Sequence, residues 1–190
     1  MPSVPASNCH DLDALRLAIA SGAQARFVFF WSHRAPSSGG ISAACLSQWY
    51  EAPFRLGGQT YPTAEHFMMA EKARLFSDHQ AERRVMEARE PGAARAVGRE
   101  VRGFVEEVWV QHRFDIAVLG NRAKFEQGKS LASFLRGTTK RVLAEASPVD
   151  RIWGIGLEAG DPRAVDPNAW QGLNLLGFAL MKVRDEMSAA

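Results

Sequence analysis

The chain has 190 residues, of which 46% are hydrophobic and 23% charged, a balance typical of a globular protein with one substantial core. Its net charge of +2 gives no strong field toward nucleic acid or an anionic membrane. Cys9 and Cys45 lie far apart in the sequence, which argues against a zinc site and a disulfide framework. No signal peptide and no run of roughly 18 apolar residues are visible, so we expect a cytoplasmic protein with no membrane partner.

The first part of the chain predicts a short helix followed by a strand. Apolar residues recur on one side of residues 11–20, and Gly22 is expected to end this helix. Residues 26–31 are rich in aromatic residues, which is typical of a buried strand. The Ser/Pro/Gly-rich residues 32–40 then predict a loop. Such a loop beside a strand end often carries binding groups, although an exposed connector explains the stretch equally well.

Residues 53–73 predict a hairpin that leads directly into a helix. Gly57 and Gly58 lie between two short strand-like runs, as expected for a tight hairpin turn. Pro62 fixes its own φ and disfavours a helical conformation in the residue before it, so the helix should begin just after this proline. Thr63 is the expected N-cap, because its hydroxyl can accept from an unpaired amide of the first turn.

Glu65 lies in the first turn of this predicted helix without a capping role. A capping box places its acid three residues after the cap, and from Thr63 that position belongs to His66. The positive end of the helix dipole favours the ionised form of a carboxylate there. An exposed first-turn glutamate and a carboxylate held at the mouth of a pocket are equally good interpretations of this local pattern.

The middle of the chain predicts more helices. Residues 82–89 are highly charged and predict a helix with a solvated face. Pro91 suits the first turn of a following helix, which we expect to close near Gly98. Residues 104–116 have apolar positions at i, i+3 and i+4 spacing, which indicates a helix facing the core. His112 lies on that stripe, and we expect it to be a core residue and not a ligand.

The C-terminal part combines helices with irregular segments. Ser130 is expected to cap a short helix over residues 131–136. Residues 142–146 fit a strand or a short helix, and their pattern does not decide between the two. Proline and paired glycines predict a constrained loop at residues 147–156. The chain then closes with an amphipathic helix over residues 174–187.

A small polar set remains once familiar motifs are excluded, since the sequence contains no Walker A loop, GxGxxG, GxSxG or HExxH pattern. This set is Glu65, Lys124, Asp150 and Trp153. Two carboxylates, an ammonium and an aromatic wall suit glycosidic cleavage, because an anion stabilises the positive charge that develops on the sugar and a second group moves protons. Trp153 or Trp31 could stack on a flat base. A structural ion-pair network at the helix start explains the same charged residues.

Five motifs in the chain together resemble the NADAR (YbiA-like) family. They are Tyr61–Phe67, Gly120–Phe125, Ser147–Gly156, Trp170–Gly177 and Leu180–Arg184. The resemblance covers about Phe29 to Arg184. It implies an α+β fold, a single helix-rich domain with a small β-sheet or hairpin, over residues 26–188. Residues 1–25 would be an N-terminal extension with a short helix.

The resemblance also implies an N-glycosidase without a metal or cofactor. Family members hydrolyse the bond between a base and ribose in phosphoribosylated riboflavin-pathway intermediates, or remove ADP-ribose from guanine bases. The expected partner is therefore a small ribosyl phosphate or an ADP-ribosyl substrate, with nucleic acid as the carrier of ADP-ribose in the second case. A non-catalytic module that binds ADP-ribose or NAD is the alternative from another functional class.

The family's catalytic glutamate falls on Glu65, and its lysine, aspartate and tryptophan positions fall on Lys124, Asp150 and Trp153. We expect the first three to be catalytic and Trp153 to bind substrate. Five further substrate-binding residues are expected, namely Gln48, Trp31, Asn121, Arg122 and Asn174. The chain departs from the family at Gln48, where many members have asparagine, and residues 32–44 form a longer connector than usual. Both departures bear on which substrate is bound.

The distribution of basic residues favours a small substrate over a nucleic acid. Nucleic-acid binding requires a basic surface that attracts phosphates. Six arginines within residues 83–102 could form such a surface, but acidic residues interleave with them and indicate a solvated helical face. They are Arg83, Arg84, Arg89, Arg95, Arg99 and Arg102.

Overall fold

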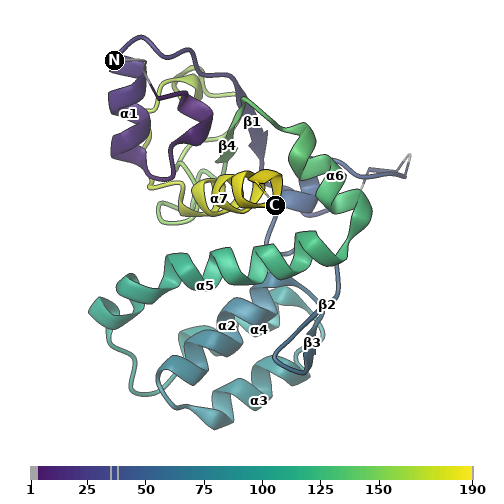
Figure 1. Cartoon of the computed structure of the whole chain (residues 1–190). Coiled ribbons are helices and arrows are strands. Elements are labelled where there is room, and N and C mark those ends of the chain that lie inside the picture. The colour runs from purple at the N-terminus through teal and green to yellow at the C-terminus, as the bar shows by residue number, and fades with distance from the viewer. Residues whose placement is uncertain (1–3, 35, 38, 190) are drawn as a thin grey trace. The chain divides into compact units, whose positions relative to one another are not determined.

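The computed structural model describes residues 4–34, 36–37 and 39–189 (Figure 1). Ala35 and Ser38 of the predicted 32–40 loop, and the first three residues of the predicted extension, lie outside the described residues. Seven α-helices and two small two-stranded sheets are present among the described residues. This content confirms the prediction of a helix-rich α+β fold. The chain divides into two compact units, Gln48–Lys129 and the combination of Met1–Ser47 with Ser130–Ala190. The domain bounds given above stay a prediction.

The unit made of Met1–Ser47 and Ser130–Ala190 is built on a parallel strand pair. Strand β1 (Phe27–Phe30) lies beside β4 (Val142–Glu145), so the undecided segment is a strand. Its helices are α1 (Leu12–Ala20), α6 (Lys129–Gly137) and α7 (Leu175–Ala189), with short 3-10 turns at Ala6–Asn8, Ala43–Leu46 and Pro162–Val165. Asp11 caps α1 by accepting from the Ala14 amide at 2.7 Å. The predicted first helix is therefore confirmed.

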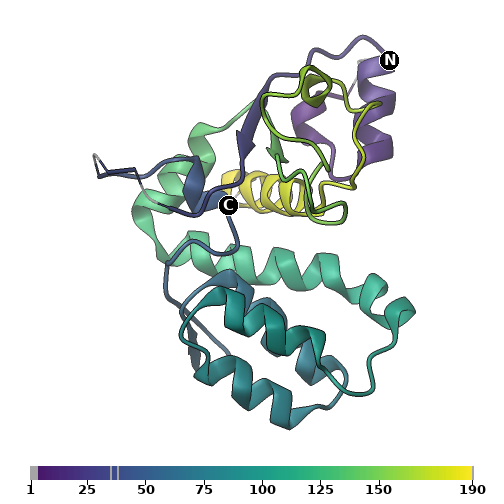
Figure 2. The ribbon, with the colours of Figure 1, turned by 180° about the vertical axis from the view of Figure 1, so that it is seen from behind.

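Helix α7 packs directly on the backbone of β4 (Figures 1 and 2). A Cβ at Gly177 would lie 2.1 Å from the Leu143 carbonyl oxygen, so only glycine allows this approach. Arg184 of α7 is buried and donates to the carbonyls of Ser7 and Arg141 at 2.6 and 2.8 Å. Because these bonds satisfy a buried charge with backbone acceptors, Arg184 holds the N-terminal segment and the start of β4 to α7.

The Gln48–Lys129 unit is organised around α2 (Ala64–Leu75). An antiparallel hairpin of β2 (Phe54–Leu56) and β3 (Gln59–Tyr61) precedes it, and Gly57 and Gly58 have φ of 58° and 80°. Positive φ at both turn residues is what a primed hairpin turn requires, so the predicted hairpin is confirmed. The covering helices are α3 (His79–Glu87), α4 (Pro91–Arg99) and α5 (Glu106–Gln127). Both ribbon views show them around α2.

Helix α4 ends at Arg99, next to Gly98 as predicted, and two glycines inside helices lie against side chains of α2. Gly98 lies within α4, where a Cβ would be 2.0 Å from the Met69 sulfur, and Gly120 lies within α5, where a Cβ would be 2.4 Å from the Phe67 ring. Each glycine therefore allows a helix to pack closely on α2. Helix α5 is consequently longer than the predicted 104–116 segment.

Three other local predictions are wrong. His112 is exposed on α5, where a backbone carbonyl one turn earlier lies 2.8 Å from its Nδ1, so it is not a core residue. Strand β1 is only partly buried, since one of its four residues is fully covered. Helix α6 begins at Lys129, one residue before Ser130, so Ser130 is not its cap.

Candidate active site

The start of α2 is held by a network between Thr63 and His66. The Thr63 hydroxyl accepts from the His66 amide at 3.4 Å, as predicted for the N-cap. The His66 ring lies between Thr63 Oγ1, 2.8 Å from Nδ1, and the Ala88 carbonyl oxygen, 3.1 Å from Nε2. Because a carbonyl only accepts, Nε2 carries the proton and Nδ1 accepts from the threonine hydroxyl. Burial lowers the pKa of His66, which keeps the ring neutral in this arrangement.

Glu65 is buried in the first turn of α2, with 4% of its surface exposed. Its backbone amide donates to the Gln48 carbonyl oxygen at 3.0 Å. This bond ties the first helical turn to the segment before the hairpin and uses no atom of the carboxyl group. The interpretation of Glu65 as an exposed first-turn acid is therefore wrong, and the carboxylate is withdrawn from water at the positive end of a helix.

Lys124 is buried on α5, with 1% of its surface exposed. Its ammonium lies 5.7 Å from the centre of the Tyr50 ring and 5.2 Å from that of Phe125, distances at which a cation is attracted to an aromatic face. Tyr50 was not recognised from the sequence as part of this set. Arg122, two residues earlier, is half-buried.

Gln48 and Asn121 connect the start of α2 to α5. The Asn121 side-chain amide donates to Gln48 Oε1 at 3.1 Å and to the Ala117 carbonyl at 2.9 Å, while Gln48 Nε2 lies 3.8 Å from the Met68 sulfur. Asn121 Oδ1 is buried without a hydrogen-bond partner among the described residues. These contacts tie the segment before the hairpin to α5, and the predicted contact of both amides with substrate stays a prediction.

The other unit presents functional groups at the carboxyl edge of its strand pair. Because β1 and β4 are parallel and Phe30 pairs with Glu145, the residues that follow both strands emerge at the same edge. Trp31 follows β1 and is 54% exposed, and the 147–156 loop follows β4. Ligands of α/β proteins commonly bind at such an edge.

Asp150 organises the loop in which it lies. Its Oδ1 accepts from the amides of Ile152 and Trp153 at 2.9 and 2.8 Å, and its own amide donates to Ser147 Oγ at 3.2 Å. A Cβ at Gly172 would lie 2.2 Å from the Gly154 carbonyl oxygen, so the loop rests backbone to backbone on the segment before α7. The prediction of a constrained loop is confirmed, and Asp150 and Trp153 are both half-buried in it.

Asn174 joins this loop to β4 and α7. It has φ of 54°, donates through Nδ2 to the Leu143 carbonyl at 2.9 Å, and accepts through Oδ1 from the Glu145 amide at 3.0 Å. Its own amide donates to the Gly154 carbonyl at 3.1 Å. Because the side chain is buried and bridges two backbone groups, the structure gives Asn174 a structural role. Its predicted contact with substrate stays a prediction.

The predicted site residues fall into two groups by unit. The Gln48–Lys129 unit holds Glu65 on α2, Gln48 before the hairpin, and Asn121, Arg122 and Lys124 on α5. The other unit holds Trp31, Asp150, Trp153 and Asn174. Sequence reasoning missed three further residues with a place beside these groups, namely Tyr50, His66 and Glu145. Of these three, only His66 could have been identified from the sequence, because it occupies the third position after the N-cap.

Neither a cluster of metal-ligating side chains nor a membrane-spanning helix is present in the described part of the chain. No group of three or more His, Cys, Asp or Glu side chains there could hold a metal ion. No helix among these residues is both long enough and apolar enough to cross a membrane. Cys9 and Cys45 are both buried and are not joined in a disulfide.

Comparisons with known proteins give consistent matches over most of the chain. Residues 29–188 match the model of the NADAR domain. N-glycosidase R617 of Acanthamoeba polyphaga mimivirus is 40% identical over 166 residues, which cover 85% of this chain and 96% of the relative. Riboflavin biosynthesis protein PYRR, chloroplastic, of Zea mays is 35% identical over 67% of this chain and 20% of its own length.

The N-glycosidase YbiA of Escherichia coli is similar in both sequence and structure. It is 28% identical over 136 residues, covering 72% of this chain and 76% of the relative. The NMR structure of E. coli YbiA superimposes with a TM-score of 0.66 at 25% identity, covering 87% of each chain.

Proposed function

Because the chain belongs to the NADAR domain family, we propose that it is a hydrolase of N-glycosyl bonds that cleaves the C1′–N bond between a ribose phosphate and a base. The relatives from mimivirus and E. coli that are named N-glycosidases support the reaction class. The name of the maize relative supports an intermediate of riboflavin biosynthesis as the substrate. The proposed partner is therefore a phosphoribosylated base.

The proposed reaction breaks the C1′–N bond and forms a C1′–O bond to water. One proton of that water is lost as the bond forms, and the leaving nitrogen of the base gains one. Positive charge develops on the ribose at C1′ and the ring oxygen in an oxocarbenium-like transition state. An ionised carboxylate held against that carbon lowers the energy of the transition state more than that of the substrate.

The observation that carries the proposal is the burial of Glu65 at the start of α2. Withdrawing a carboxylate from water costs free energy. Buried carboxylates are nevertheless common at functional sites, because the chemistry there needs the charge. The helix dipole favours the ionised form, which suits a base or an electrostatic stabiliser better than an acid. We assign to Glu65 the stabilisation of C1′ or the orientation of the attacking water, and to Lys124 an electrostatic role beside it on the same unit.

The remaining predicted residues have supporting roles in this proposal. Asp150 binds sugar hydroxyls or helps to move a proton through the carboxylate whose Oδ1 also holds its loop. Trp153 and Trp31 provide aromatic faces for the base, and Arg122 a guanidinium for a phosphate.

Pairing of surface arginines supports a small substrate over an ADP-ribosylated nucleic acid. Arg84 bonds to Glu100 at 2.7 Å and Arg102 bonds to Asp78 at 2.8 Å. Both arginines belong to the group of six that could have formed a basic surface. Since their charge is offset locally, the α3–α4 region is a poorer attractor of phosphates than the count of arginines suggests.

Chromatography of released bases tests the proposal. Purified protein is incubated with a phosphoribosylated aminopyrimidine of the riboflavin pathway and, separately, with an oligonucleotide carrying ADP-ribosyl guanine. We expect free base from the first substrate, and none with Glu65→Gln. A matched control is Glu107→Gln, which alters an exposed first-turn glutamate of α5 and should retain activity.

Three outcomes would count against this proposal. Release of ADP-ribose from the oligonucleotide alone would favour the guanine hydrolase. Saturable binding of ADP-ribose in calorimetry without release of base from either substrate would favour the non-catalytic module. Full activity of Glu65→Gln would remove Glu65 from the reaction.

A further inference from the structure

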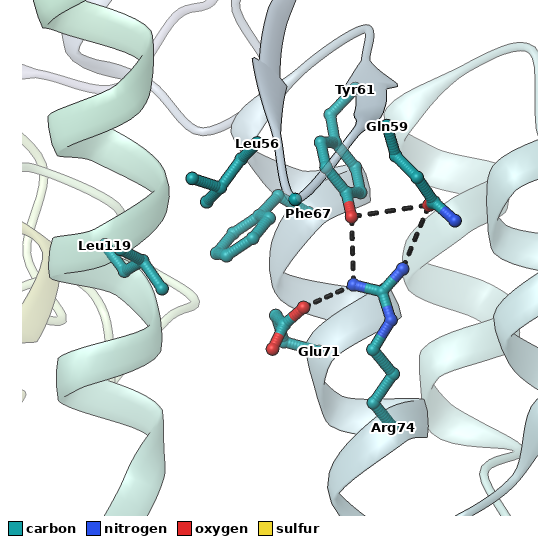
Figure 3. A pocket seen from close by; sticks show the side chains of 8 residues that line it. Leu56, Gln59, Tyr61, Phe67, Glu71, Arg74 and Leu119 are labelled. Carbon is teal, nitrogen blue, oxygen red and sulfur yellow. Dashed lines mark hydrogen bonds and ion pairs between the residues drawn. The ribbon is translucent and has the colours of Figure 1, made fainter.

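A separate pocket of about 310 Å³ opens on the Gln48–Lys129 unit, formed by the hairpin, α2 and α5 (Figure 3). Its volume is at the lower end of the range of pockets that hold small molecules. Leu56, Phe67 and Leu119 line one side, and Tyr61, Glu71 and Arg74 line the other. No residue of the candidate active site is among its lining residues.

The pocket lies on the opposite face of α2 from Glu65. With 3.6 residues per turn, Phe67, Glu71 and Arg74 are rotated around the helix axis by roughly 200°, 240° and 180° from Glu65. A ligand in the pocket therefore occupies a different side of the helix from a substrate at Glu65. Binding there can be measured independently of the glycosidase reaction.

The apolar side of the pocket is incompletely covered. Leu119 is 43% exposed, and Leu56 is half-buried. Phe67 is fully buried beneath them and packs edge-on against Tyr61, with ring centroids 5.1 Å apart. Exposed leucines beside a hollow leave apolar area that a ligand with a hydrophobic body can remove from water.

The polar side of the pocket carries one guanidinium, Arg74, whose hydrogen bonds are already made. Arg74 donates to Tyr61 Oη at 2.9 Å, to Gln59 Oε1 at 3.0 Å and to Glu82 Oε1 at 2.8 Å, and it also donates to Glu71 Oε1. These partners raise the pKa of Arg74. The guanidinium is therefore engaged by Glu71 of the pocket and by Glu82 outside its lining, so it is not available to an anion in the pocket.

Glu71 provides the group with which a ligand can bond. Its Oε1 accepts from Arg74, and no described residue donates to its Oε2. The side chain is 27% exposed, so a hydrogen-bond donor can reach it without unfolding the surroundings. A carboxylate at the polar end of an apolar hollow is complementary to a planar cation or a charged amine.

We propose that this pocket is a binding site for a small molecule with a flat apolar body and an amidine or protonated amine. The body packs against Leu56, Phe67 and Leu119, and the nitrogen donates to Glu71. The site is distinct from the glycosidase centre and does not depend on the proposed function.

Benzamidine is a suitable probe, because it joins a flat ring to an amidinium. Isothermal titration calorimetry on the full chain should show saturable binding that weakens about tenfold or more in Glu71→Gln, the loss of one charge-assisted hydrogen bond. Glu65→Gln and Glu107→Gln should keep the affinity, since both lie outside the pocket. Benzoate, the anionic counterpart of similar shape, should not bind. Leu119→Ser should weaken binding by a smaller factor.

Three results would overturn the proposal. They are the absence of saturable benzamidine binding, equal affinity in wild type and Glu71→Gln, and benzoate binding as tight as that of benzamidine. Loss of affinity in Glu65→Gln with retention in Glu71→Gln would place the probe at the candidate active site instead. If Glu71→Gln does not fold, the comparison of the two probes on the wild-type chain decides.

Discussion

The start of α2 and the 147–156 loop both present an acid that we propose acts on substrate, but the two acids are held differently. The turn at Glu65 is fixed by a backbone bond to the Gln48 carbonyl and by the Thr63–His66 network. The loop at Asp150 is fixed by the Asp150 carboxylate itself, which accepts two backbone amides. A substitution of Glu65 can therefore remove its charge without removing the bonds that hold its turn. Truncation of Asp150 removes its charge and also the acceptor that holds its loop.

The largest effect is expected on catalysis at Glu65. Glu65→Gln should lower kcat by about 10³-fold, while Asp150→Asn should lower it by about 10- to 100-fold, because the first removes charge at the sugar and the second a supporting contact. Steady-state assay of base release measures both. Equal losses in the two variants would contradict the separate roles given to the two acids.

A large structural effect is expected at Gly172. A Cβ there would meet the Gly154 carbonyl oxygen at 2.2 Å and Arg151 Cα at 2.8 Å, and both neighbours are backbone. Gly172→Ala should therefore lower the free energy of unfolding by roughly 2–4 kcal/mol and reduce activity through the displaced loop. Gly160→Ala, where no atom lies within 4 Å, is the matched control and should unfold like wild type in urea.

A moderate effect on stability is expected at Asp150, and it separates the structural role of the carboxylate in its loop from its proposed role in catalysis. Asp150→Ala leaves the Ile152 and Trp153 amides without their acceptor and should cost about 1–2 kcal/mol of stability. Asp150→Asn keeps an oxygen acceptor, so its stability should stay near that of wild type while its activity falls. Thermal unfolding of the pair checks this, and equal melting temperatures for both variants would show that the carboxylate does not hold the loop.

The smallest expected effect is a dependence of folding stability on pH that arises from His66. Burial lowers the pKa of His66 below its ordinary value of 6.5, so the unfolded chain takes up a proton more readily than the folded one. The contribution to stability is complete above pH 6.5 and is lost as the pH falls through the folded-state pKa. Urea unfolding between about pH 7.5 and about pH 5 should show a decline that is smaller in His66→Gln. His112→Gln, which alters an exposed histidine, should keep the wild-type slope.

Neighbouring residues determine some of these features, and segments distant in the sequence determine others. The hairpin and the Thr63 cap follow from neighbouring residues, since paired glycines allow positive φ and proline limits the start of the helix. The burial of Glu65 was not predictable, because a local pattern does not report which segments cover a first-turn residue. Likewise β4 could not be assigned, since its parallel partner β1 lies far away in sequence.

Gly120 and Asn174 have packing roles that local sequence does not report. Gly120 lies inside α5, where its missing side chain makes room for Phe67. The Asn174 side chain bridges Leu143 and Glu145, and its predicted contact with substrate stays a prediction. Both roles arise from contacts between distant segments, and local propensity carries no information about such contacts.

The most direct test of the central claim is a single-turnover experiment with enzyme in excess over a phosphoribosylated aminopyrimidine. We predict that wild type and Glu107→Gln release one free base per ribose phosphate at the same rate. Glu65→Gln should bind the substrate but release base about 10³-fold more slowly. Release by Glu65→Gln at the wild-type rate would contradict the assignment of this buried carboxylate to the cleavage of the C1′–N bond.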